Sequence, residues 1–275
     1  MEKKNRTFTT FNNKEITIIS DLTDNPLDNV YTCYFNNDPE TTYVLKLRLK
    51  ATGGMFKERN FYLRVLIEDN IIEFENKHNI ILGVPQLISY GSVVINQEKY
   101  IFIIMDHYNR NISNKCYKKT AIDILYVLEF IHSHNFVHND IKLENLVEPN
   151  NSNPVYVIDF GLVSKYKNNL NIHVTNEENN DFKEVGTREF LSRDAHIGKT
   201  SRRSDLETLL YNLVHWENEL PWRHITDMEA IHNMKKRFVV DTNIYSPHLK
   251  DFHEYILSLS FEEEPNYNIC RNFFM

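Results

Sequence analysis

Short apolar runs over the first third of the chain predict β-strands. Residues 16–19 and 43–47 are rich in β-branched or aromatic side chains, which favour strands. Residues 100–105 are continuously apolar, so we expect a strand that is buried on both faces. Between the first two strands, the polar stretch 23–29 contains Pro26 and predicts a turn.

Apolar residues at helical spacing begin within this strand-rich part and dominate after residue 106. Residues 57–66 and 71–78 predict two short helices. Further along, helical periodicity is found at 120–134, 204–216 and 249–259, and a short strand is predicted at 155–159. The pattern therefore predicts an α+β protein whose strands come first and whose helices follow, without a repeat or a long linker.

Composition and charge narrow the class of protein. The chain has 275 residues, of which 41% are apolar and 25% charged, as in ordinary globular proteins. Its net charge of −7 argues against direct nucleic-acid binding, which usually needs a basic face. Cys33, Cys116 and Cys270 lie far apart, fit no metal-binding pattern and suggest a reducing compartment. No apolar run is long enough to span a bilayer, so we expect no membrane association.

The strongest chemical signal is the segment 138–145, with the sequence HNDIKLEN. It matches the pattern H-x-D-x-K-x-x-N, the catalytic loop of protein kinases. Phosphoryl transfer needs a group that accepts the proton of the substrate hydroxyl, and Asp140 is the candidate. Lys142 would steady the transferred phosphate, and the amide oxygen of Asn145 would bind magnesium. We therefore predict ATP and Mg²⁺ as cofactors.

Three further residues complete the predicted site. Asp159 begins an Asp-Phe-Gly sequence at the end of an apolar strand, and its carboxylate would bind magnesium. Lys46 lies on a predicted strand and would reach the α- and β-phosphates of ATP. Its expected partner is Glu58 on the following helix; Glu68 is a second choice because it lies near a helix end.

Taken together, these residues resemble those of the vaccinia-related kinases, a branch of the casein-kinase-1 group, and the chain is most similar to the poxviral members. The likeness covers nearly the whole chain and is carried by FKERNFY at 56–62, LGVP at 82–85, SRDAHIG at 192–198, SRRSDLETL at 201–209, LPW at 220–222 and EPNY at 264–267. It implies a bilobal protein-kinase fold and a serine/threonine protein kinase activity. A single kinase domain would occupy residues 1–275, with a small β-rich lobe to about 105 and a larger helical lobe from about 106.

The resemblance also implies roles for individual residues. Asp205 should hold the backbone of the catalytic loop, and Thr187 should touch the catalytic acid and lysine. Met105 and Asp106 should border the adenine pocket, where Tyr108 offers a backbone N–H. The implied substrate is a small DNA-bridging host protein, and the implied location is cytoplasmic, in the cytoplasm of the host cell if the chain is viral.

The chain departs from the kinase pattern at the glycine-rich loop. Where G-x-G-x-x-G is expected, Thr23, Asn25 and Asp28 replace the glycines, and Pro26 lacks an N–H. At roughly 8 Å and an effective dielectric of about 20, one aspartate repels a phosphate charge by about 2 kcal/mol. Two hypotheses follow: a working kinase with weakened ATP binding, or a pseudokinase that acts as a non-catalytic binding or scaffold module. The intact catalytic and metal-binding residues favour the first.

Two other features receive a structural interpretation. The basic run 235–237 is interpreted as a solvated helix face rather than a docking patch. The histidines at 132, 134 and 138 have spacings that fit no closed metal site.

Overall fold

The computed structural model describes residues 6–10, 14–22, 29–50, 54–95, 97–108, 117–149, 154–174 and 183–275. The chain forms two compact units. The small unit comprises residues 1–72 and 84–109, and the large unit comprises residues 73–83 and 110–275. The candidate glycine-loop positions Thr23, Asn25 and Asp28 lie outside the described residues, as does Cys116.

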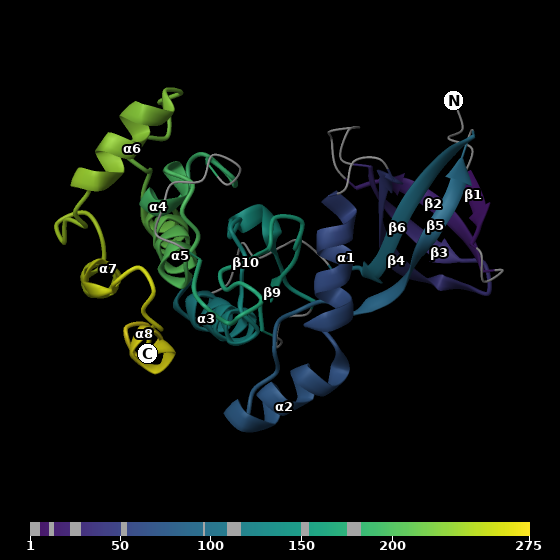
Figure 1. The fold of residues 1–275 in the computed structure, drawn as a ribbon, viewed down its shortest axis with the longest axis horizontal. Helices are drawn as coiled ribbons and strands as arrows, with labels where there is room; N and C mark the ends of the chain where they lie inside the picture. The colour runs from purple at the N-terminus through teal and green to yellow at the C-terminus, as the bar shows by residue number, and fades with distance from the viewer. Residues whose placement is uncertain are drawn as a thin grey trace. The chain divides into compact units, whose positions relative to one another are not determined.

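The small unit is built on an antiparallel sheet (Figure 1). Its strands are β1 (Arg6–Thr9), β2 (Glu15–Asp21), β3 (Val30–Phe35), β4 (Asp38–Leu49), β5 (Leu87–Ile95) and β6 (Glu98–Asp106), in the order β1-β2-β3-β4-β6-β5. The stretch Ile101–Met105 of β6 is buried at every position, as its continuous apolar sequence predicts. The core of the sheet includes Ile16, Leu45 and Ile104, each fully buried. Helix α1 (Gly54–Arg64) packs against β5 and β6.

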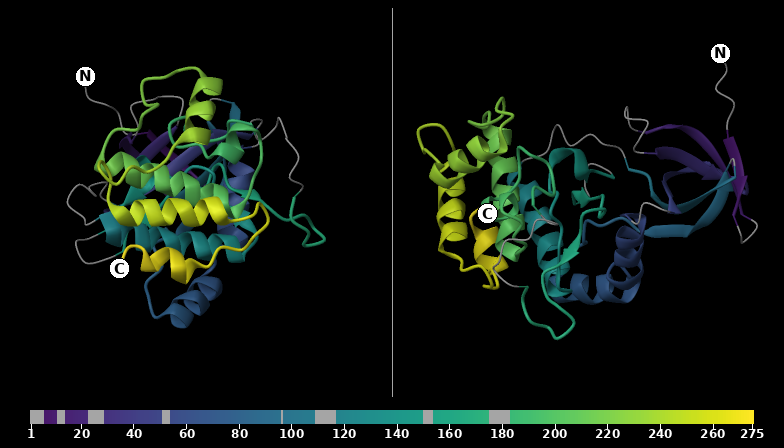
Figure 2. Two further views of the ribbon diagram at one scale, coloured as in Figure 1. Left: turned by 90° about the vertical axis from the view of Figure 1, so that its left-hand side faces the viewer. Right: turned by 45° about the horizontal axis from the view of Figure 1, so that its top comes forward.

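The large unit is mostly helical. Its helices are α3 (Tyr117–Ser133), α4 (Arg193–His196), α5 (Arg202–Glu217), α6 (Met228–Arg237), α7 (Pro247–Ser258) and α8 (Tyr267–Asn272). Helix α5 packs against both α3 and α7 (Figure 2), and it is therefore buried on nearly all sides. Helix α2 (Glu68–His78) begins in the small unit and ends in the large one, where Phe74 meets the ring of Phe130 edge-on at 5.4 Å.

Two small antiparallel ladders shape the loops of the large unit. Strand β7 (Phe136–Val137) pairs with β10 (Ser164–Lys165), and β8 (Leu146–Val147) pairs with β9 (Tyr156–Val157). The predicted strand at 155–159 is thus shorter than expected, and the chain leaves it before Asp159. These ladders bring the segments around residues 138–145 and 158–164 side by side. In the described part of the chain, no helix is long and apolar enough to cross a membrane.

Candidate active site

The loop 138–142 follows β7, and a buried carboxylate holds its backbone by hydrogen bonds. Asp205, in the first turn of α5, accepts hydrogen bonds from the backbone N–H groups of His138 (2.7 Å) and Asn139 (2.9 Å), as the resemblance implies. His132 Nε2 lies 2.8 Å from the same carboxylate. Burial acts to raise the pKa of Asp205, but the hydrogen bonds and charges of the two histidines hold that pKa below its ordinary value. A charged Asp205 therefore sets the path of the loop.

Three neighbouring side chains surround the carboxylate of Asp140. Lys142 Nζ lies 2.8 Å from Asp140 Oδ2, and Asn145 Nδ2 donates to the same oxygen at 3.2 Å. Thr187 donates its hydroxyl proton to Asp140 Oδ1 (2.7 Å) and accepts from Lys142 Nζ (2.9 Å). Asp140 is only 6% exposed, so these contacts hold it in one orientation. The structure thus brings the predicted base and the predicted phosphate-binding lysine into one cluster.

The predicted metal ligands flank the two strands of the β8–β9 ladder. Asn145 precedes β8 and Asp159 follows β9, and Ile158 N–H donates to Asn145 O at 2.9 Å, so both residues lie at the same end of the ladder. The nitrogen of the Asn145 amide is turned toward Asp140, and its other atom is a carbonyl oxygen. An amide oxygen and a carboxylate are hard donors of the kind that Mg²⁺ prefers. The donor set therefore fits magnesium, which Asn145 and Asp159 would hold together.

Gly83 lets the segment 82–85 pack closely against strand β9 of this ladder. Val157 N–H donates to Gly83 O at 2.9 Å. A Cβ atom at Gly83 would lie 1.9 Å from the carbonyl oxygen of Val155, so no other residue fits without moving the backbone. The LGVP segment thus positions the strand that leads to Asp159.

The small unit holds the other predicted nucleotide-binding residues. Lys46 Nζ in β4 lies 2.7 Å from Glu58 Oε1 in α1, and both side chains are at most 10% exposed. The structure thus pairs Lys46 with Glu58, the partner preferred over Glu68. Asp106 ends β6, where its carboxylate accepts from the Tyr108 hydroxyl at 3.0 Å and from the Gln86 N–H at 3.3 Å.

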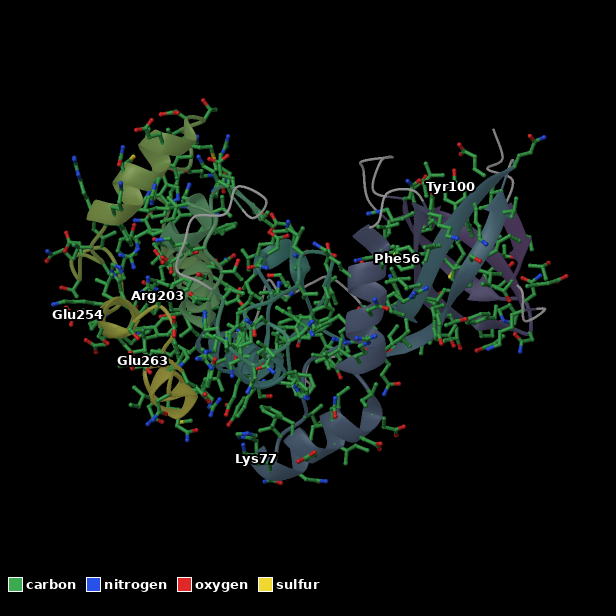
Figure 3. The ribbon with its side chains drawn as sticks, in the orientation of Figure 1. Phe56, Lys77, Tyr100, Arg203, Glu254 and Glu263 are labelled. Carbon is green, nitrogen blue, oxygen red and sulfur yellow. The ribbon has the colours of Figure 1, made fainter. Side chains whose placement is uncertain are left out.

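The segment at 201–209 braces the large unit. Arg203, labelled in Figure 3, forms a two-pronged ion pair with Asp194, with Nε–Oδ2 at 2.7 Å and Nη2–Oδ1 at 3.0 Å. It also donates to Leu259 O beyond α7. Arg193 pairs with the buried Glu207 at 2.6 Å. Two arginine–carboxylate pairs therefore tie α4 to α5, directly after the loop that contains Thr187.

The interpretation of the basic run 235–237 as a solvated helix face is wrong for Lys235, although Lys236 and Arg237 are exposed. Lys235 is 1% exposed, and its Nζ donates to the carbonyl oxygens of Leu191 (2.7 Å) and Arg188 (3.1 Å). It also lies over the rings of Tyr211 and Trp222 at 5.1 and 5.2 Å. Burial lowers the pKa of Lys235 to about 7, against the opposing charges of nearby glutamates. Sequence alone gave no signal for this role, because the carbonyls that bind the lysine are more than forty positions away.

Trp222 completes the support of the loop 187–191. Its Nε1 donates to Glu189 O at 2.8 Å. Trp222 and Lys235, both after α5 in the chain, thus hold three carbonyl groups of the loop.

The histidines make structural contacts: His132 contacts Asp205, and the ring of His138 meets that of Phe160 edge-on at 5.3 Å. Among the residues that the structure describes, no cluster of three or more His, Cys, Asp or Glu side chains forms a metal site.

Comparison with known proteins matches this geometry to one family. The model of the protein kinase domain matches residues 68–262. A probable serine/threonine-protein kinase of Fowlpox virus is 33% identical over 262 residues, which are 86% of this chain and 84% of that protein. The B1 kinase of Vaccinia virus (strain Western Reserve) is 32% identical over 272 residues, 90% of this chain and 89% of that protein.

A cellular relative and a solved structure agree. Nucleosomal histone kinase 1 of Drosophila melanogaster is 32% identical over 84% of this chain but only 42% of its own length, so the chain spans less than half of that relative. The solved structure of vaccinia related kinase 3 superposes with a TM-score of 0.83 at 24% identity, over 98% of this chain and 89% of that one. It confirms the protein-kinase fold, with a β-sheet lobe and a helical lobe. The chain belongs to the protein kinase family and, within it, to the vaccinia-related kinases.

Proposed function

We propose that this protein transfers the γ-phosphate of ATP to serine or threonine hydroxyls of a protein substrate. The observation that carries the proposal is the contact set of Asp140. Its carboxylate is held by Lys142, Asn145 and Thr187 at 2.7–3.2 Å, in a loop that Asp205 fixes from beneath. Positioned charges of this kind are the main contribution that a protein makes to phosphoryl transfer.

Each residue has a defined task in this proposal. Asp140 accepts the proton of the substrate hydroxyl, and Lys142 lies beside it to neutralise charge on the transferred phosphate. Asn145 and Asp159 bind magnesium, which offsets the negative charge of the phosphates when bound. In the small unit, Lys46 binds the α- and β-phosphates and Glu58 holds that lysine in place.

Asp106 is proposed to border the adenine pocket, and Tyr108 is proposed to offer the adenine a backbone N–H. Asp106 lies at the end of a buried strand, and its carboxylate is engaged by the Tyr108 hydroxyl and the Gln86 N–H. These contacts fix the chain where β6 ends, so that the backbone after it presents hydrogen-bonding groups in a defined direction.

The substrate is proposed to be a basic, DNA-associated protein, such as a small DNA-bridging host protein, encountered in the host cytoplasm. One similar protein is named a nucleosomal histone kinase, and others are the B1 kinases of poxviruses. The net charge of −7 supports a basic protein substrate rather than nucleic acid itself.

The test is a titration of the purified full chain with ATP and magnesium. Transfer of labelled phosphate is followed to a generic basic protein, and the same preparation is examined by calorimetry for Mg-ATP binding. Asp140→Asn is the matched variant, because it keeps the size of the side chain and deletes the proton acceptor. We expect transfer in the unmodified protein, almost none in the variant, and an unchanged fold in both.

Two results would contradict the proposal. Undiminished transfer by Asp140→Asn would overturn the assignment of the base. Absence of both Mg-ATP binding and transfer in the unmodified chain would favour a pseudokinase that acts as a binding module.

A further inference from the structure

Asn139, the residue before the proposed base, has an unusual backbone and an engaged side chain. Its φ of 69° lies in the left-handed region, which asparagine and glycine adopt more readily than other residues. Its amide Nδ2 donates to Leu162 O at 2.8 Å and to Ser164 Oγ at 2.9 Å. Both hydrogens of the amide are therefore used.

Both partners belong to the segment that follows the metal ligand Asp159. Ser164 pairs in the β10–β7 ladder with Val137, the residue directly before the catalytic loop. The backbone N–H of Asn139 is meanwhile held by Asp205. One residue thus connects the support in α5, the catalytic loop and the segment after Asp159.

We infer that Asn139 is a positioning residue that orders the segment after Asp159 without a phosphate group. Kinases switched by phosphorylation often place an arginine before the catalytic aspartate, where it grips a phosphorylated side chain. Here a neutral amide makes the connection directly, through two short hydrogen bonds. The consequence is a metal-binding segment that is already ordered in the unmodified chain.

Asparagine satisfies two requirements at this position. Glycine would adopt the left-handed backbone but has no side chain to donate. Aspartate would adopt it as well, yet its carboxylate cannot donate and would face the carbonyl oxygen of Leu162. The inference rests on the proposed kinase activity only for its kinetic readout, because order in the segment is measured separately.

The experiment compares Asn139→Gly and Asn139→Asp with the unmodified chain. Asn135→Gly is the matched control: Asn135 has a φ of 67°, and no hydrogen bond from its side chain to residues 162–164 is found among the described residues. The first readout is hydrogen exchange at residues 162–164, and the second is the magnesium concentration that gives half-maximal transfer. Each is measured before and after phosphatase treatment.

We expect both Asn139 variants to exchange these amides faster and to need about tenfold more magnesium, as loss of about 1.4 kcal/mol predicts. Asn135→Gly should match the unmodified chain in both readouts, and phosphatase should change neither. Ser164→Ala should give part of the effect, and it should add little to Asn139→Gly, since one bond cannot be lost twice.

Wild-type exchange and magnesium dependence in both Asn139 variants would overturn the inference, as would loss of order or activity after phosphatase treatment. If the unmodified chain transfers no phosphate, the proposed function fails while the exchange comparison still decides the role of Asn139. Faster exchange in both variants but not in the control would then support it.

Discussion

Replacing Asp205 by asparagine is the sharpest test of how the site is built, because the carboxylate is fully buried and has three hydrogen-bond donors around it. Oδ2 faces the His138 N–H and His132 Nε2, and Oδ1 faces the Asn139 N–H. An asparagine offers one oxygen only. If that oxygen takes the place of Oδ2, its NH₂ group points at the Asn139 N–H; in the other orientation it points at the other two donors.

The magnitude follows from these contacts. Each hydrogen bond to a charged group contributes about 1.5–3 kcal/mol, and a buried donor left without a partner costs about 1–3 kcal/mol more. At least one bond is lost and two donors are forced together, so we expect Asp205→Asn to lower the free energy of unfolding by about 3–5 kcal/mol.

The stability contributed by the Asp205 carboxylate should also depend on pH. The pKa of Asp205 is lower in the folded protein than its ordinary value, so its contribution to stability is present above that ordinary value. The contribution is lost as pH falls through the lowered pKa. The difference in stability between the unmodified chain and Asp205→Asn should therefore be constant near neutral pH and shrink in strong acid.

The assay is urea unfolding at neutral pH, followed by tryptophan fluorescence. Both tryptophans, Trp216 and Trp222, lie in the large unit and so report on the part of the chain that contains Asp205. Asp251→Asn is the control, since Asp251 is an exposed residue of α7. A stability of Asp205→Asn within about 1 kcal/mol of the unmodified chain would refute the reasoning, because surface changes usually stay within about 0.5 kcal/mol.

Three further predictions concern the proposed activity. Lys46→Met should raise the KM for Mg-ATP at least tenfold, because it removes the cation proposed to bind the phosphates; an unchanged KM would contradict that role. Thr187→Val keeps the shape of the side chain but deletes the hydroxyl between acid and lysine, so we expect kcat to fall about tenfold, and equal kcat values in a steady-state assay would count against the contact. Restoring glycine at positions 23, 25 and 28 should tighten Mg-ATP in calorimetry, with a part of the gain that salt removes because it comes from the charge of Asp28; identical affinity would show that this loop does not limit binding.

Sequence predicts those parts of the site whose residues lie close together in the chain. The loop 138–145 and the Asp-Phe-Gly sequence have fixed spacings because neighbouring residues in the chain perform one task. The same is true of α3, whose apolar residues repeat at helical spacing and are buried as expected. The choice of Glu58 as partner of Lys46 depended only on finding a strand followed by a helix.

The parts that sequence did not predict depend on distant contacts. Strand β5 contains Gly91 and Ser92, which disfavour strands, and it forms because β6 pairs with it along its length. The burial of Lys235 depends on carbonyl groups of the loop 187–191, and in a run of three basic residues nothing distinguishes it from its neighbours. Helices α4 and α8 are too short for their periodicity to be recognised.

The support of the loop 187–191 by Lys235 and Trp222 has an evolutionary consequence. The two side chains hold backbone carbonyls, so the loop keeps its path whatever side chains it carries at Arg188 and Glu189. Substitutions at these two half-buried positions would therefore leave the path of the loop unchanged. The loop can therefore vary at Arg188 and Glu189 in the course of evolution, while Lys235 and Trp222 stay fixed.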